Sequence, residues 1–380
     1  MRGLTAAVVF GTLGALTIMI VPGFVMLVSA QTGLDDRHLG FVASADINAT
    51  AVAMGLATFL IARRNWRHLL IVGAALMVLG TALTAGSHTY AGIVAARVCA
   101  GLGEGLVIAV SFAALGSASN PDRAFGIYLV VGLTVSAAVL AVLPWLQGSV
   151  GPAAVFAGIA VVMLLSCALV TWLPERNPAS ASWSEGAPAI SKELTVAGLS
   201  GVFLYFIAQG AMWSYFERIG TASGVDPLFI GEAMGLSSFA GMGGALLAVA
   251  VCTRLGRALP LILTGGISIV SFFMLRGHVT PAALMSAGLL FNFAWNLAQP
   301  LLSGVCAEAD SQGRVVVAMG CIQTVGFGLG PALAALLLRG HDFSPVVWMS
   351  TTVLVLSLAI VLAGLKARHH RVVSASLRPA

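Results

Sequence analysis

Long apolar stretches alternate with short polar ones along the whole chain. Twelve stretches can be delimited, and most approach the roughly 20 residues that a helix needs to cross a bilayer. They occupy residues 4–30, 39–62, 68–86, 91–116, 124–147, 150–173, 194–216, 227–252, 258–275, 280–306, 314–338 and 343–365. The pattern predicts an all-α integral membrane protein with twelve transmembrane helices. The first stretch is too long for the core of a signal peptide, so we expect it to be retained as one helix.

Composition supports this prediction and excludes a water-soluble protein. Of 380 residues, 59% are hydrophobic and 9% are charged, whereas soluble domains have about 45–50% and about 25%. The formal net charge is +5, but the basic residues lie in short loops and not in one patch, so no nucleic-acid partner is expected. The five cysteines are scattered through apolar stretches and the histidines lie near span ends, so neither a disulfide framework nor a metal site is predicted.

Positive charge is distributed unevenly between the loops. With twelve spans, most of the 19 Lys and Arg residues fall in the loops that share a side with both termini. Loops rich in Lys and Arg stay in the cytoplasm, so both termini are predicted there. The expected location is the plasma membrane, as a multi-pass protein of a bacterial inner membrane. An odd number of spans would destroy the asymmetry.

The chain also divides into two similar halves. A segment rich in Pro, Ser, Ala and Glu, at residues 174–193, is predicted to be a cytoplasmic linker between six spans in residues 1–173 and six in residues 194–380. When the sequence is shifted by half its length, Arg63 aligns with Arg254 and Arg123 with Arg314. Chance alignment in an apolar chain is one explanation. The other is a parallel repeat of two six-helix bundles, a plan in which solute sites lie between the repeats.

Short motifs lie at matching places in the two halves. The pattern G-x-x-x-D-R-x-G-R-R is partly kept in two loops, and in both the Asp is replaced. The loop after the second span keeps Arg63 and Arg67, and the loop after the eighth keeps Arg254, Gly256 and Arg257.

The fourth span contains the pattern R-x-x-x-G-x-G, as Arg97, Gly101 and Gly103, and the eleventh contains a glycine run that ends in Pro331. In order and depth these motifs resemble those of the major facilitator superfamily, and the resemblance covers nearly the whole chain. It implies two pseudo-symmetric six-helix bundles that rock around a central solute cavity. It also implies a gating role for the arginines and the glycine of the two loops, with a simpler role at helix ends as the alternative.

Several ionisable side chains are predicted inside spans, where each is costly unless it has a partner or a function. Asp46 and Arg97 lie at similar depth in the second and fourth spans, and they are expected to form a structural ion pair or a proton-exchange couple. Glu104 follows Arg97 by two turns on the same helix face. It is the main candidate to carry a proton or to meet a cationic solute, with a structural hydrogen bond as the alternative. Glu217 and Arg218, near the end of the seventh span, are expected at the membrane interface.

Uncharged polar residues suggest where a solute binds. Asn292, Asn296 and Gln299 share one face of the tenth span, while Gln209 and Trp213 lie in the seventh. We expect these five residues to bind the solute. Hydrogen bonding between helices is the alternative for the amides, and membrane anchoring is the alternative for the tryptophan.

A Walker-type phosphate loop is absent from the sequence, so solute movement must draw on an ion or solute gradient. We expect a secondary transporter of a small organic solute, with protons as the coupling ion and export favoured over uptake. A transporter-like sensor would need a signalling domain, and a membrane enzyme would need clustered acids or histidines at a membrane edge. Neither is found, so no enzymatic activity and no cofactor are expected. The expected partners are the solute, protons and the lipid bilayer, and the protein is expected to be a monomer.

Overall fold

The computed structural model describes residues 2–61, 63–175, 192–252, 256–309 and 314–376, which are almost entirely helical. The first half of the chain forms α1 (Arg2–Met19), α2 (Val21–Thr32), α3 (Asp36–Ile61), α4 (Trp66–Gly86), α5 (Tyr90–Gly116), α6 (Pro121–Val150), α7 (Pro152–Ser166) and the 3₁₀ helix η1 (Cys167–Trp172). The second half forms α8 (Lys192–Ala222), α9 (Pro227–Cys252), α10 (Ala258–Met274), α11 (Pro281–Ala309), α12 (Arg314–Leu337) and α13 (Ser344–Ser376). Helices occupy the described part of every predicted span. The predicted all-α membrane fold is confirmed.

The first predicted span is not one helix. α1 ends at Met19 and α2 begins at Val21, because Ile20 leaves the helical conformation with φ −105° and ψ 22°. Pro22 stands in the first turn of α2, and its missing N–H removes a hydrogen bond that a continuous helix would make to the preceding turn. The prediction of a single helix over residues 4–30 is therefore wrong.

The sixth predicted span ends in a tighter helix. α7 passes into η1, and the backbone becomes extended at Leu173. Most of the predicted linker at residues 174–193 lies outside the described residues, and α8 begins within it at Lys192.

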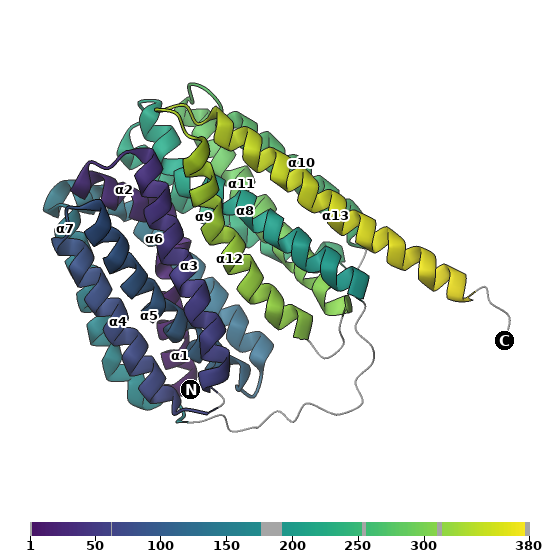
Figure 1. Cartoon of the computed structure of the whole chain (residues 1–380), viewed down its shortest axis with the longest axis horizontal. Helices are drawn as coiled ribbons and strands as arrows, with labels where there is room; N and C mark the ends of the chain where they lie inside the picture. Colours follow the sequence, from purple (N-terminus) through teal and green to yellow (C-terminus); the bar gives the residue numbers. More distant parts are fainter. Residues whose placement is uncertain (1, 62, 176–191, 253–255, 310–313, 377–380) are drawn as a thin grey trace.

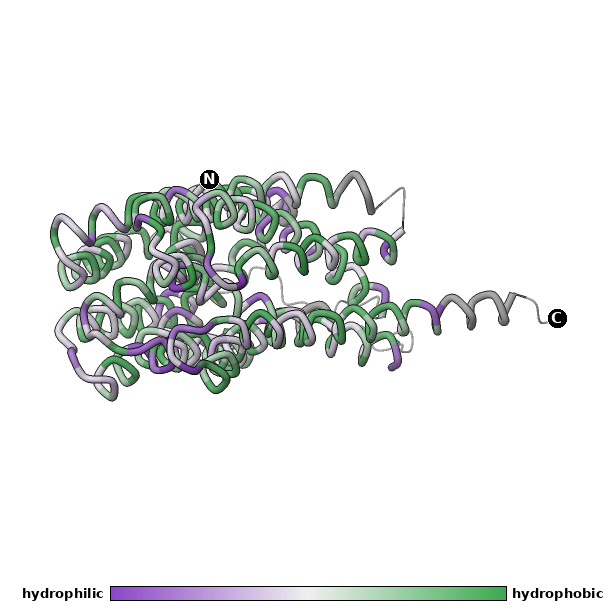
Figure 2. The backbone as a smooth tube through the Cα atoms, turned by 90° about the horizontal axis from the view of Figure 1, so that it is seen from above, coloured by the Kyte–Doolittle hydropathy of each residue, from purple (hydrophilic) through white to green (hydrophobic). Residues whose placement is uncertain are grey.

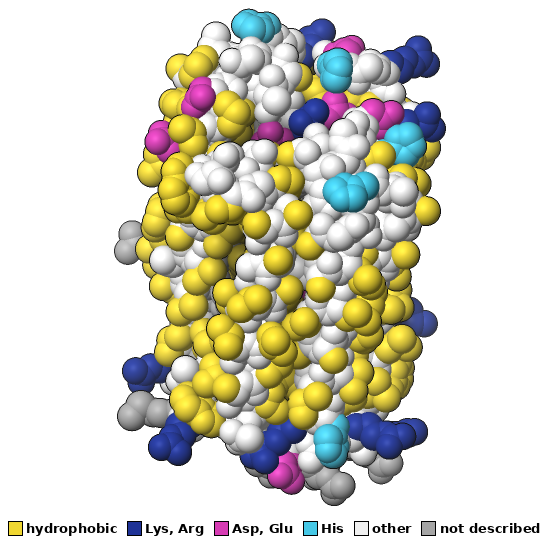
Figure 3. All heavy atoms as spheres, turned by 90° about the vertical axis from the view of Figure 1, so that its left-hand side faces the viewer, with side chains coloured by type: hydrophobic (Ala, Val, Ile, Leu, Met, Phe, Trp, Pro, Cys, Tyr) yellow, Lys and Arg dark blue, Asp and Glu magenta, His cyan; other side chains and the backbone are white. Residues whose placement is uncertain are grey.

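The outer surface has the apolar belt of a membrane protein. Nine of the described helices are individually long and apolar enough to cross a bilayer. Phe59, Leu165 and Leu246 are 73%, 69% and 74% exposed, and so much exposed apolar surface needs a partner other than water. Figure 3 shows charged side chains gathered at the two ends of the molecule with hydrophobic side chains between them. In Figure 2, hydrophobic residues run along most of the helices. This apolar surface therefore faces the lipid of the membrane.

Helices α1–η1 and α8–α13 form two bundles (Figure 1). The bundles meet at the end of the molecule where α2 leads into α3 and α8 into α9, which we call the far end. They diverge toward the end that carries the N-terminus, which we call the near end. The largest buried apolar cluster joins the two bundles, since it includes Ile47 and Leu140 of the first and Phe216 and Met234 of the second.

The glycine run of α12 lets this helix pack closely against α8 of its own bundle and against α3 of the other bundle. A side chain at Gly326 or Gly330 would meet backbone atoms of α8 at 2.5 Å. A side chain at Gly328 would meet the amide of Asn48 in α3 at 2.8 Å. Glycine is needed at these positions because no larger residue leaves room for the neighbouring helices. The bundles are therefore joined where α12 packs on α3 and where α9 packs on α6, whose backbone a side chain at Gly231 or Gly235 would meet at 2.9 Å.

Candidate transport site

Arg97 contacts both predicted carboxylates at one point within the first bundle. Its Nη2 donates to the Asp46 Oδ1 and Oδ2 atoms at 2.9 and 3.0 Å and to Glu104 Oε1 at 2.9 Å. The three side chains are between 1% and 2% exposed. The structure thus brings together the three ionisable residues that sequence reasoning proposed for proton coupling. We call them the triad.

Close packing of α3 on α5 holds the triad in place. A side chain at Gly101 or Gly105 would meet the backbone oxygens of Asp46 and Thr50 in α3, each at 2.3 Å. Glycine therefore lets the two backbones approach far enough for short hydrogen bonds between their side chains. The two triad members on α5 are seven residues apart, which places both of them on the face toward α3.

Two hydroxyls and an aromatic ring complete the surroundings of the triad. Thr17 of α1 donates to Glu104 Oε1 at 2.8 Å, and Thr50 Oγ1 lies 3.4 Å from Glu104 Oε2. The Arg97 guanidinium lies 4.7 Å from the centre of the Phe24 ring. α2, which begins at the break after Ile20, therefore covers the cation with an aromatic face. Sequence reasoning missed these three neighbours.

The triad contains unequal numbers of acids and bases. Two carboxylates share one guanidinium, so the group has a net negative charge when both are ionised. It becomes neutral when either carboxylate binds a proton. An unbalanced charge is expensive to bury away from water. The protonated, neutral triad is therefore more stable when buried, and the deprotonated triad is more stable when water can reach it.

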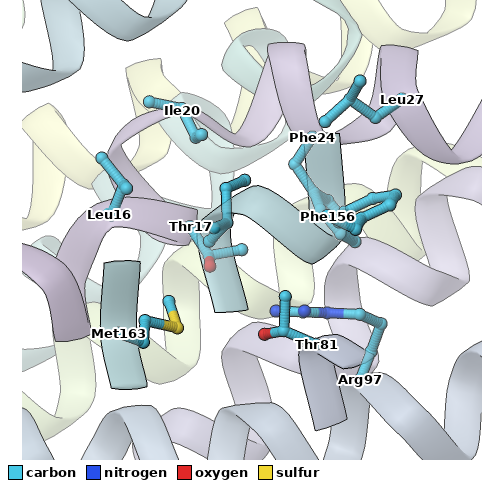
Figure 4. Close-up of a pocket in the computed structure, with 10 residues that line it drawn as sticks. Leu16, Thr17, Ile20, Phe24, Leu27, Thr81, Arg97, Phe156 and Met163 are labelled. Atoms are coloured by element: carbon cyan, nitrogen blue, oxygen red, sulfur yellow. The ribbon is translucent and has the colours of Figure 1, made fainter. Parts of the chain in front are cut away.

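A small cavity of about 20 Å³ adjoins the triad inside the first bundle (Figure 4). Thr17, Thr81 and Arg97 form its polar wall, and Phe24 and Phe156 belong to its apolar wall. A cavity of this size holds about one water molecule. The Arg97 Nε atom is buried and has no hydrogen-bond partner among the described residues, so the guanidinium has a donor that neither carboxylate uses.

A much larger cavity of about 780 Å³ lies between the bundles, and we call it the central cavity. Its wall includes Thr58 and Ile61 from the end of α3, Phe125 from the start of α6 and Gly320 from the start of α12. These residues lie toward the near end, where Figure 1 shows the bundles apart. The volume is in the range that accommodates a drug-sized molecule. The triad residues are not part of the wall.

Four of the five residues predicted to bind the solute line the central cavity: Trp213, Asn292, Asn296 and Gln299. Gln209 does not. Its side chain is fully buried in α8, and neither its amide oxygen nor its amide nitrogen has a partner among the described residues. In this conformation Gln209 faces packed helices and not the solute space.

Sequence reasoning missed most of the aromatic wall. Phe112, Tyr128, Phe206 and Phe327 all line the central cavity. An aromatic residue is common in any apolar span, and its type does not reveal whether it faces lipid, packed helices or a cavity. No local signal could have identified these residues.

The loop after α3 lies at the near end, and its predicted gating residues differ in their contacts. Arg67 donates to the Leu173 carbonyl oxygen at 2.7 Å and pairs with Glu175 Oε1 at 2.8 Å. Arg63 is exposed. Arg67 therefore ties the start of α4 to the end of η1 within the first bundle.

The corresponding loop after α9 is described only in part, because Arg254 lies outside the described residues. Gly256 has φ +65°, in the left-handed region that favours glycine. Arg257 donates to a backbone carbonyl of α11 and pairs with Glu308. This arginine ties the start of α10 to the end of α11, as Arg67 ties α4 to η1.

A second ion pair, with a buried carboxylate and a partly exposed arginine, joins the bundles at the far end. Asp36, at the start of α3, is 3% exposed, and its Oδ1 accepts from Arg218 Nε of α8 at 2.6 Å. Tyr215 Oη donates to the Asp36 carbonyl oxygen at 2.9 Å, and His341 Nδ1 lies 3.3 Å from Asp36 Oδ2. We call these four residues the far-end latch.

The surroundings of the latch correct part of one sequence prediction. Arg218, expected at the membrane interface, crosses to the other bundle. Glu217 is 3% exposed, and its Oε1 accepts from Thr221 at 2.6 Å. The prediction of an interfacial and not a buried position is therefore wrong for Glu217, whereas Arg218 stays partly exposed. Distance from a span end indicates depth, but it does not indicate whether lipid or another helix covers the residue.

Comparisons with known proteins agree with this architecture. The nucleoside transporter NupG has 13% identity and a TM-score of 0.74, over 96% of this chain and 99% of its own. A D-xylose–proton symporter has 16% identity and a TM-score of 0.74, over 96% of each chain. A bacterial homologue of the human lysosomal transporter Spinster, in an inward-facing conformation, has 14% identity and a TM-score of 0.65, over 95% of this chain and 94% of its own. No curated protein matches. At these identities the likeness concerns the fold.

The family evidence is broader. The family model described as Major Facilitator Superfamily matches residues 5–324, which is most of the chain. The helical fold, the apolar belt and the cavity between two bundles agree with it. The chain therefore belongs to the Major Facilitator Superfamily and is a multi-pass membrane transporter of small solutes.

Proposed function

We propose that this protein couples the movement of a small organic solute to that of protons. The observation that carries the proposal is the triad, in which two buried carboxylates share one guanidinium. Glu104 is the proposed proton carrier because it is hydrogen-bonded to both Arg97 of α5 and Thr17 of α1, so a change in its protonation alters contacts with both helices. Asp46 and Arg97 form an ion pair whose strength depends on the charge of Glu104, because Arg97 contacts both acids. One neighbour by fold is named a proton symporter.

Alternating access supplies the transport cycle. The loop charges favour a cytoplasmic position for both termini, in which case the near end faces the cytoplasm of the bacterial cell. The wide near end and the latch at the far end support an inward-facing conformation. Rocking of residues 1–173 against residues 194–380, joined by the linker, opens the far end in turn. The monomer is the proposed transport unit, and the two arginine loops at the near end are its proposed cytoplasmic gates.

The direction of transport depends on how the proton site and the solute site are related. Export is the direction that sequence reasoning favours. One observation supports the second candidate, proton-coupled uptake: the triad lies outside the wall of the central cavity. A proton and a solute can therefore be bound together, as symport requires. Exchange by direct competition instead requires a shared site.

Proteoliposomes with an imposed pH gradient test the coupling. Uridine and D-xylose are the first solutes to assay, because two neighbours are named for nucleosides and xylose, and a thermal-shift screen extends the panel. In the wild type the pH gradient should drive accumulation, and its sign distinguishes uptake from export. Glu104→Gln retains the side-chain size but cannot release the proton. It should abolish accumulation driven by the pH gradient while counterflow of labelled solute continues.

Glu232→Gln is the matched control, because Glu232 is an exposed carboxylate on α9 and should be dispensable. Asp46→Asn tests whether the second acid of the triad is also required. Accumulation that survives Glu104→Gln unchanged would remove Glu104 from coupling. Solute binding without any flux would identify a sensor instead of a transporter.

A further inference from the structure

The central cavity indicates the charge of its solute. Among the described residues of its wall there is no Asp, Glu, Lys, Arg or His. A charged solute would lose its water there without gaining a counter-charge, which is strongly unfavourable. The triad and the far-end latch, where buried charges are paired, both lie outside the wall. The cavity therefore suits an uncharged solute.

Aromatic rings line the cavity from both bundles. In the second bundle, Trp295 and Phe327 stack with centroids 5.5 Å apart and an interplanar angle of 26°, and Phe206 meets Trp295 edge-on at 6.2 Å. In the first bundle, Phe112 and Tyr128 meet edge-on at 5.2 Å. All five residues belong to the wall. Rings on both sides favour a solute with a flat ring system, which can stack or pack edge-on.

Amides of α11 add a hydrogen-bonding edge. Asn292 Nδ2 donates to Ser237 Oγ, and Asn296 Nδ2 donates to the Asn292 carbonyl oxygen, each at 2.9 Å. These bonds use the amide nitrogens and leave the side-chain oxygens as acceptors. The Gln299 amide makes no hydrogen bond to a described residue, so it offers both a donor and an acceptor to the cavity. Such an edge suits N–H and O–H groups.

We propose that the solute is an uncharged molecule with a flat ring system and N–H or O–H groups along one edge. The ring lies between the aromatic residues of the two bundles, and the polar edge lies on Asn296 and Gln299. This assignment rests on the proposed function, because it takes the central cavity to be the transport path. It adds that cations and anions are poor solutes, and that each transported proton moves one net charge across the membrane.

Three probes of one shape and different charge test the assignment: naphthalene-2-carboxamide, the cationic carboxamidine and the anionic carboxylate. Binding to the purified protein in lipid nanodiscs is measured by calorimetry at neutral pH without a pH gradient. The amide should bind at least about tenfold more tightly than either ion, because neither ion finds a counter-charge. The saturated decahydro-amide should bind several-fold more weakly than the aromatic amide, because it cannot stack.

Two variants locate the binding. Trp295→Leu and Gln299→Leu remove one ring and one amide from the wall, and each should weaken binding of the aromatic amide by about tenfold. Trp145→Leu and Gln147→Leu are the matched controls. Both lie on α6 outside the wall, with Trp145 59% exposed, and binding to these variants should match the wild type.

Either ion binding as tightly as the amide overturns the assignment, and so does failure of the wild type to bind any of the three probes. Equal weakening in the wall variants and their controls overturns it as well. The proposed function fails separately. If the amide binds in the expected order but a pH gradient drives no solute, the cavity assignment stands and proton coupling falls. If a pH gradient drives a permanent cation instead, coupling stands and the assignment falls.

Discussion

Arg97 is the residue on which the buried charges of the first bundle depend. One of its nitrogens contacts both Asp46 and Glu104, and Phe24 covers the guanidinium. Removing one member of a buried ion pair is more damaging than the pair is stabilising, because the remaining charge is left without a partner in a low-dielectric interior. Loss of Arg97 leaves two carboxylates in that condition. Its contribution to stability should therefore exceed that of either acid.

Arg97→Ala should lower the free energy of unfolding by about 3–5 kcal/mol. Asp46→Asn added to it removes one of the two unpaired charges, so the double variant should be more stable than Arg97→Ala alone. Thermal unfolding midpoints of the purified proteins in detergent give the order. Arg64→Ala, at an exposed loop residue, should change stability by no more than about 0.5 kcal/mol. A double variant less stable than Arg97→Ala would contradict this role.

Charged residues of the site were predictable from sequence, and their neighbours were not. Helical spacing relates Arg97 to Glu104, and depth in the bilayer relates Asp46 to Arg97, because both are local properties of a span. Thr17 and Phe24 are ordinary residues of an apolar stretch. They reach the triad only because tertiary packing brings α1 and α2 beside α5, which no local pattern encodes.

At the scale of the element, α5 is positioned by glycines on two faces. A side chain at Gly103 would meet the Gly73 carbonyl of α4 at 2.4 Å, while Gly101 and Gly105 face α3. Helices in lipid associate through close backbone packing and hydrogen bonds, so small residues on both faces allow α5 to lie between α3 and α4. That position places its two charged residues in the interior of the first bundle and away from lipid.

Gly101→Ala and Gly105→Ala should each destabilise the protein by about 1–3 kcal/mol, because the added methyl group overpacks the contact with α3. Both should also weaken proton coupling, since α3 carries Asp46. Gly116→Ala is the control on the same helix, because an added Cβ there meets no atom within 4 Å. Thermal unfolding and transport driven by a pH gradient measure the two effects. Stabilisation at all three positions would show that the higher helix propensity of Ala, and not the contact, decides.

Hydropathy predicted where the spans lie, because each bilayer crossing needs a similar apolar length. It did not predict the break at Ile20 or the 3₁₀ end of the sixth span. The break depends on the backbone chemistry of Pro22, and proline scarcely alters the hydropathy of so long a stretch. Interruptions of this kind matter here, because the break turns Phe24 toward the triad.

At the scale of the molecule, the buried charged side chains among the described residues are those of the triad, Asp36 of the far-end latch and Glu217 next to Arg218. The triad lies within one bundle and the latch lies between the bundles, so the two clusters have different expected roles. Breaking a contact within a bundle lowers the stability of that bundle. Breaking a contact between bundles changes the ratio of the conformation closed at the far end to the one open there. The latch escaped prediction because Asp36 and Arg218 belong to different halves of the chain, and each looks like an ordinary residue at a span end.

Asp36→Asn keeps the size of the side chain and removes its charge, so it should weaken closure of the far end and leave each bundle packed. A hydrogen bond between charged groups contributes about 1.5–3 kcal/mol, which changes the ratio of two conformations by roughly 10–100-fold. Cys321 lines the central cavity and reports the change. In a variant with this cysteine alone, an impermeant thiol reagent on the far-end side should modify Cys321 faster once Asp36 is replaced.

The neighbouring Asp35→Asn is the matched control, because Asp35 is exposed and pairs with His38 within its own helix turn. Its labelling should equal that of the parent, since no contact between bundles is lost. Labelling from the near-end side in inverted vesicles should fall in Asp36→Asn as the far end opens, because one cavity cannot open widely to both sides at once. Faster labelling from both sides would point to local unfolding, and unchanged labelling from both would show that packing of α12 on α3 closes the far end without the latch.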